Sequence, residues 1–187
     1  TYLNSNKKNF INKLEIILNR RRTRDSRKYL LVKKIIKDIK KNKDKALIKY
    51  EKKFSNINNI KNKNIKFSKF EIDKVVKKLD KNIKKSIDLA FLRIYKFHKK
   101  QKFNSYSLTD KYNNILKYTS SPIERVGVYV PGGTASYPSS VLMNCIPAMI
   151  AGVKNIYMTT PTINKKYNAA VIYAAKKCKV KEIYKVG

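Results

Sequence analysis

The sequence predicts an α/β protein, in which a helical N-terminal region precedes a parallel sheet built as β-α-β-α-β. Apolar residues recur at helical spacing through most of the first 100 residues. Two runs of β-forming residues, 126–130 and 155–160, flank an apolar helical segment, and this order builds parallel sheets. Between the first run and that helix, Pro131-Gly132-Gly133 makes the chain turn, because strand and helix interiors tolerate these residues poorly.

The N-terminal region is predicted to consist of short amphipathic helices. Apolar stripes predict helices over residues 8–19, from Ser26 to about 41, and around Leu47 to Phe54. The basic run from Arg20 is expected to end the first helix. Asn42 is suited to cap the second, since Asn tolerates the left-handed conformation. Residues 55–66 are Asn-rich and predict an irregular surface segment, with a short strand near 65–67.

A capping-box signature opens the next helical region. Ser68 is followed three residues later by Glu71, and each side chain can accept a hydrogen bond from a backbone N–H of the first turn. The apolar pattern shifts register around residues 80–82 and then continues in a long helix as far as His98. Residues 103–120 mix Tyr, Ser, Thr and Asn with few aliphatic side chains, which predicts a loop with one or two strands of an antiparallel ribbon.

The composition changes near residue 120. The first 120 residues carry 36 basic and ten acidic side chains, whereas the last 67 carry nine and two. We therefore predict a domain boundary between Ser120 and Tyr129. Beyond it the pattern predicts three parallel strands and two crossover helices, in the order strand 126–130, helix 138–151, strand 155–160, helix 164–178 and strand 182–186.

The formal net charge of +33 raises the possibility of a nucleic-acid or acidic-partner binding module, because lysines that neutralise phosphates release counterions and raise affinity. However, only seven of the 45 basic residues are Arg, the residue favoured for bidentate phosphate and base contacts. The lysines are scattered along every predicted helix, which favours solvated surface positions without a nucleic-acid partner. The basic binding module remains the alternative function.

The sequence also predicts a cytoplasmic protein that does not associate with membranes. It contains no run of eighteen apolar residues, and its first residues lack the apolar core of a signal peptide. Cys145 and Cys178 both fall in apolar helical segments, which predicts buried, reduced thiols with a structural role.

Few residues suggest chemistry. Tyr129 ends the first predicted strand, where open α/β sheets place ligand-binding groups, although a β-forming aromatic is also ordinary there. The segment 132–136 could cradle an anion at a helix N-terminus or could be merely a turn. His98, the one histidine, is more typical of a packed residue near a helix end. One His and two distant Cys do not supply the convergent ligands of a zinc site, so we expect no metal ligand in this chain.

The segment ERVGVYVPGGTASYPSSVLMNCIPAMIAGVKNIYMTTP, residues 124–161, closely resembles the histidinol dehydrogenase family. That family carries R-V-G-x-Y-x-P-G-G, then Y-P-S-S-V-L-M-N, I-P-A and A-G-V. Upstream, residues 44–54 resemble its D-x-A-L-x-x-Y-x-x-x-F helix, and Phe97-His98 with Gln101 resembles its F-H-x-x-Q. Downstream, residues 183–187 resemble the strand that leads into its G-G-A-Q-A segment.

The resemblance implies an enzyme that oxidises L-histidinol to L-histidine in two NAD-dependent steps through histidinaldehyde. In the family a zinc ion positions the substrate and a Glu-His pair transfers protons. The resemblance further implies an intertwined, cytoplasmic homodimer whose Rossmann-like domains lack the usual dinucleotide fingerprint. It implies that a tyrosine at the position of Tyr129 contacts NAD, and Tyr129 is the one site residue that carries over.

The resemblance also implies that this chain corresponds to an N-terminal part of the enzyme. Residues 1–25 would be an N-terminal helical segment, 26–125 the mainly helical part of a first, interrupted domain, and 126–187 an incomplete Rossmann-like NAD-binding domain. The family's catalytic pair and zinc ligands lie in the half that follows the position of Gly187. We therefore expect no catalytic residue here, zinc ligands outside the chain, and no dehydrogenase activity from the chain alone.

Overall fold

The computed structural model describes residues 3–22, 26–55, 60, 62–132, 137–162 and 167–187. Of residues 19–22, 26, 27, 62 and 63 only the backbone is described. The chain divides into two compact units, residues 1–50 and 51–187. The domain boundaries expected from the sequence stay predictions.

The first unit is helical. It contains α1 (Phe10–Arg22) and most of α2 (Ser26–Ser55). The prediction that the basic run ends the first helix is wrong, because α1 continues through Arg22, in keeping with the high helix propensity of Arg. The predicted break at Asn42 falls one residue later, at Lys43, whose φ of 48° and ψ of −128° interrupt α2.

Asp38 links the two sides of this break. Its carboxylate accepts hydrogen bonds from Asn42 Nδ2 at 2.6 Å, Lys49 Nζ at 3.0 Å and Tyr50 OH at 2.8 Å. These hydrogen bonds, in that order of importance, lower the pKa of Asp38 to about 2. The Asp38 carboxylate therefore links Lys49 and Tyr50, after the break, to the first part of the helix.

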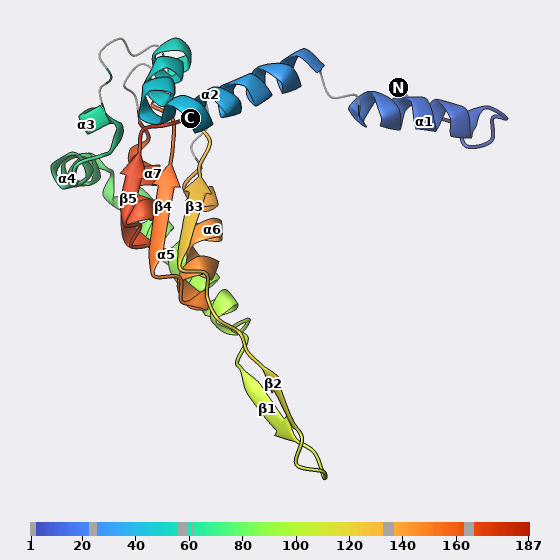
Figure 1. Cartoon of the computed structure of the whole chain (residues 1–187). Helices are drawn as coiled ribbons and strands as arrows, with labels where there is room; N and C mark the ends of the chain where they lie inside the picture. Colours follow the sequence, from blue (N-terminus) through green and yellow to red (C-terminus); the bar gives the residue numbers. More distant parts are fainter. Residues whose placement is uncertain (1–2, 23–25, 56–59, 61, 133–136, 163–166) are drawn as a thin grey trace. The chain divides into compact units, whose positions relative to one another are not determined.

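A three-stranded parallel sheet organises the second unit (Figure 1). Its strands are β3 (Arg125–Tyr129), β4 (Asn155–Thr159) and β5 (Glu182–Tyr184), in that spatial order. The crossovers contain α6 (Pro138–Ala151) and α7 (Ala169–Lys177), which pack against each other. Both crossovers step the same way across the sheet, and right-handed connections therefore place both helices on one face.

Burial along the strands follows this arrangement. Val128, Ile156, Met158 and Ile183 are buried on the helix face, whereas the residues between them on β4 and β5 are only half-buried. Two further helices, α4 (Lys69–Lys78) and α5 (Lys81–Lys99), cover the crossover helices: α4 packs on α7, and α5 on both α6 and α7. The core thus lies between the sheet and its helices.

Local signals account for the starts of these helices. Both halves of the predicted capping box are present, since Glu71 N donates to Ser68 Oγ at 3.1 Å and Ser68 N donates to Glu71 Oε2 at 2.7 Å. The predicted register shift is the junction between α4 and α5, where Asp80 caps α5. The last crossover helix begins later than predicted, because Asn168 caps α7 at Ala169; residues 164–166 of the predicted helix lie outside the described residues.

Two short pieces border the sheet. After α3 (Asn62–Ile65), the strand predicted near 65–67 is a single antiparallel bridge between Lys66 and Tyr184 at the edge of β5. The predicted antiparallel ribbon is confirmed as β1 (Tyr106–Thr109) and β2 (Ile115–Tyr118), both exposed. The predicted fold class, a helical N-terminal region followed by a parallel β-α-β-α-β unit, is confirmed.

Candidate functional site at the carboxyl edge of the sheet

The three parallel strands end together at one edge of the sheet, where open α/β folds bind their ligands. The register places Tyr129 opposite Thr159 and Thr159 opposite Tyr184. The alternation of β3 directs Val128 into the core, whereas Tyr129 is 59% exposed. The sequence-predicted cofactor residue therefore stands accessible at the expected edge.

Backbone hydrogen bonds continue past the strand ends. Val130 N donates to Thr159 O at 2.9 Å, and Thr160 N donates to Tyr184 O at 3.0 Å. Val130, Thr160 and Thr162 are all buried. The segments that leave β3 and β4 are thus held in place at the edge that carries Tyr129. Of the predicted anion-binding segment 132–136, only Gly132 lies within the described residues.

The helices that begin near this edge differ in their caps. Asn168 Oδ1 accepts hydrogen bonds from Ala170 N and Val171 N at the start of α7. Tyr137, at the N-cap of α6, makes no side-chain cap hydrogen bond within the described residues, and Pro138 follows it at the first helical position. Pro138 has no N–H and Ser140 N donates to Tyr137 O at 3.1 Å, so the N-terminus of α6 offers mainly the positive end of its dipole.

A buried carboxylate that sequence reasoning missed lies beside the segment after β5. Glu51, four residues before the end of α2, is 4% exposed. Its Oε1 accepts a hydrogen bond from Gly187 N at 3.0 Å and its Oε2 one from Ser55 Oγ at 2.7 Å. Along the sequence Glu51 resembles a solvated helix residue, because its partner Gly187 lies 136 positions away. No local signal could have identified it.

Lys185 provides a second anchor for the same segment. Its ammonium donates to Glu71 Oε1 at 2.6 Å and lies 4.6 Å from the centre of the Phe67 ring. The Lys185 side chain is 15% exposed and that of Glu71 42%. The strand end after β5 is thereby tied to the capping box of α4.

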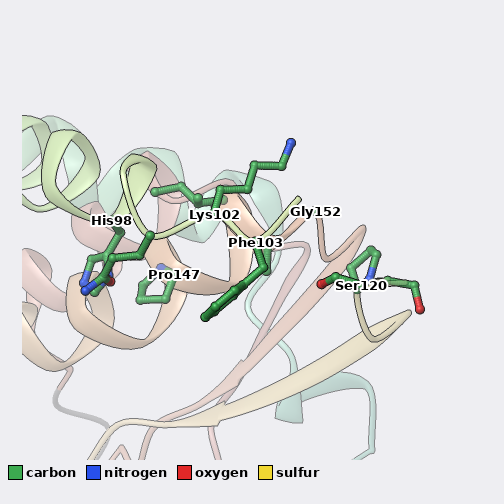
Figure 2. Close-up of a pocket in the computed structure, with 11 residues that line it drawn as sticks. His98, Lys102, Phe103, Ser120, Pro147 and Gly152 are labelled. Atoms are coloured by element: carbon green, nitrogen blue, oxygen red, sulfur yellow. The ribbon is translucent and has the colours of Figure 1, made fainter. Parts of the chain in front are cut away.

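A pocket of about 540 Å³ lies at the opposite end of the sheet, beside the segments that lead into β3 and β4 (Figure 2). His98 lines it, and its Nδ1 lies 2.6 Å from Gln101 Oε1. The Phe97 ring meets the imidazole edge to face, with centroids 5.3 Å apart. The structure thus brings Phe97, His98 and Gln101 of the F-H-x-x-Q pattern together, but away from Tyr129.

The two thiols lie in the core and not at the edge. Cys145 and Cys178 are free and fully buried. The contact with Cys145, followed by burial, raises the pKa of the Cys178 thiol, which disfavours a reactive thiolate. Among the described residues, no group of three or more His, Cys, Asp or Glu side chains could hold a metal ion. No helix in the described part of the chain is long and apolar enough to cross a membrane.

The chain is similar in sequence to known proteins over nearly its whole length. The family model of histidinol dehydrogenase matches residues 18–187. A histidinol dehydrogenase from Pelagibacter ubique is 53% identical over 185 residues, which are 99% of this chain and 42% of the relative. One from Helicobacter hepaticus is 36% identical over 186 residues, which are 100% of this chain and 43% of the relative.

A solved structure agrees with the sequence relatives. The crystal structure of histidinol dehydrogenase from Elizabethkingia anophelis superposes with a TM-score of 0.79 at 36% identity, over 88% of this chain and 37% of that one. The chain thus spans about two fifths of the length of the relatives it matches. With a family match over residues 18–187 and a matching fold, the chain belongs to the histidinol dehydrogenase family.

Proposed function

We propose that this chain is the N-terminal part of an NAD-dependent, zinc-requiring histidinol dehydrogenase, which oxidises L-histidinol to L-histidine through histidinaldehyde. The observation that carries the proposal is the family match over residues 18–187. The 53% identity to a relative named histidinol dehydrogenase supports the same activity for the whole protein. A homodimer and a cytoplasmic location are part of the proposal and rest on family membership alone.

The carboxyl edge of the sheet fits a dinucleotide. Tyr129 offers an exposed aromatic face, and the N-terminus of α6, which has no side-chain cap within the described residues, offers the positive end of a helix dipole, which suits a pyrophosphate. NAD, when bound, supplies the acceptor for the hydride that leaves the substrate. In this proposal Tyr129 contacts and orients the cofactor and takes no part in proton transfer.

The described residues do not fit zinc. They supply no cluster of three or more candidate ligands, and both cysteines are buried within the core. We therefore propose that the zinc ligands and the catalytic acid and base lie outside this chain. The isolated chain should then bind NAD weakly and leave histidinol unchanged.

Two measurements on the purified 187-residue chain test the proposal. With L-histidinol, NAD and zinc, the absorbance of NADH should not rise; NADH formation would refute the expected inactivity of the isolated chain. In a calorimetric titration, Tyr129→Ala should weaken NAD binding by about five- to tenfold, because it removes one aromatic contact.

Tyr112→Ala is the matched control for Tyr129→Ala. Tyr112 is 73% exposed, as accessible as Tyr129, but it lies in the turn of the ribbon. Neither substitution should shift the melting temperature by more than about 1 °C, since both side chains are exposed. Equal NAD affinity in the two variants would show that Tyr129 does not contact the cofactor.

A further inference from the structure

Pro161 lies between two glycines at the carboxyl edge. Gly132 follows β3, Pro161 follows β4 and Gly187 follows β5. A Cβ atom added to Gly132 would lie 2.5 Å from Pro161 Cγ, closer than side chains approach one another. A Cβ atom added to Gly187 would overlap Pro161 Cβ and lie 3.0 Å from Cγ. The three post-strand segments therefore meet on one proline ring.

Space alone requires glycine at these two positions. Neither Gly132 nor Gly187 has the positive φ that disfavours other residues, in contrast to Gly152, whose φ is 95°. An alanine at Gly132 or Gly187 would thus find an acceptable backbone but no room. Pro161 sets how closely the segments after β3 and β5 approach the segment after β4.

Hydrogen bonds hold the segments around Pro161 in place. Thr160 and Thr162, on either side of the proline, are 6% and 2% exposed, and Thr160 N is bonded to Tyr184 O. On the β5 side, the buried Glu51 carboxylate accepts a hydrogen bond from Gly187 N. Because neither neighbour of Pro161 can move easily, an added methyl group would have to displace the segment that carries it.

We propose that Pro161 is a positioning residue, which sets the spacing of the Gly132 and Gly187 segments and thereby the shape of the cofactor edge beside Tyr129. The inference rests on the proposed NAD site and adds the element that gives this site its dimensions. Pro161 acts through the two glycine segments and needs no contact of its own with the cofactor.

A double-mutant cycle on the 187-residue chain tests the Gly132 side, with NAD as the titrant. Gly132→Ala should weaken NAD binding about tenfold and lower the melting temperature by roughly 3–9 °C, as expected for overpacking. Pro161→Ala removes Cγ and Cδ and leaves Cβ, which lies 3.5 Å from the added methyl group, an ordinary contact. In the Pro161→Ala background, Gly132→Ala should therefore cost little further affinity or stability.

Gly187→Ala is the matched control, because the clash there involves Pro161 Cβ, which alanine retains. Its effects on affinity and melting temperature should persist in the Pro161→Ala background. Additive effects of Gly132→Ala and Pro161→Ala would overturn the inference, and so would equal rescue of both glycine variants. An effect on melting temperature with unchanged NAD affinity would overturn the link to the cofactor.

The two proposals fail in different ways. If the unsubstituted chain binds no NAD at all, the proposed cofactor site in this chain is refuted. The melting temperatures of the single and double variants then still test whether Pro161 packs against Gly132. Non-additive changes in melting temperature support this packing, and additive changes refute it.

Discussion

Glu71 is expected to stabilise the second unit in two separable ways. Its Oε2 accepts the hydrogen bond from Ser68 N in the capping box of α4, and its Oε1 accepts one from the Lys185 ammonium. Glu71→Gln keeps an oxygen for the capping box but loses the charge that pairs with Lys185. Glu71→Ala loses both contacts, and Ser68→Ala removes only the side-chain cap.

The structure ranks the three substitutions. Loss of the Ser68 cap should cost about 1 kcal/mol of unfolding free energy. The ion pair should contribute about 0.5 kcal/mol or less, because the Glu71 side chain is 42% exposed and solvent screens the charge. Glu71→Gln should therefore lower the melting temperature by about 1–2 °C, whereas Ser68→Ala should lower it by about 2–4 °C and Glu71→Ala by slightly more.

The pH dependence provides an independent check. Burial by itself raises the pKa of Glu71, but the hydrogen bonds from Lys185 and Ser68 outweigh it, so the pKa lies below its usual value of 4.5. A carboxyl group whose pKa is lowered on folding stabilises the fold above its unfolded pKa. This contribution should be complete above about pH 4.5 and disappear as the pH falls further, and Glu71→Gln should lack it.

Thermal unfolding of the four proteins, followed by circular dichroism at several pH values, measures these effects. If Glu71→Gln costs as much as Glu71→Ala, the ion pair dominates and the assignment to the capping box is wrong. If Ser68→Ala is neutral, the cap contributes nothing to stability, although its geometry is present.

Three other features give measurable expectations. In the first unit, Asp38→Asn should loosen the part of α2 after the break. Because the pKa of Asp38 is lowered from 3.8 to about 2, the stabilisation by this carboxylate should be complete above about pH 4 and decline toward pH 2. Amide hydrogen exchange of residues 44–50 measures this effect, and unchanged exchange at both pH values would contradict it. Cys145 and Cys178 should react with a thiol-specific reagent only in denaturant, since both are fully buried, and rapid labelling of the native chain would show the opposite. Binding to duplex or single-stranded DNA should be weaker than about micromolar at physiological salt, and micromolar affinity with a steep salt dependence in a filter-binding titration would instead support the basic binding module.

Interactions between close neighbours in the chain can be predicted from the sequence. Ser68 and Glu71 stand three positions apart, so their mutual hydrogen bonds depend only on one helical turn. The alternation of β-forming and helical runs after residue 120 likewise predicts the three strands and α6 almost to their ends. Where the predictions are wrong, local competition decides: Arg20 to Arg22 extend α1 because arginine is itself a good helix former.

The order of the helices and strands, the capping box, the family resemblance and the position of Tyr129 at a strand end are all evident from the amino-acid sequence. The burial of Glu51 against Gly187 and the position of Pro161 against Gly132 and Gly187 become evident only in the folded chain. The difference lies in the range of the interactions. Hydrophobic periodicity and helix caps act between neighbours in the chain, whereas these contacts exist only after parallel pairing brings the ends of three distant strands to one edge.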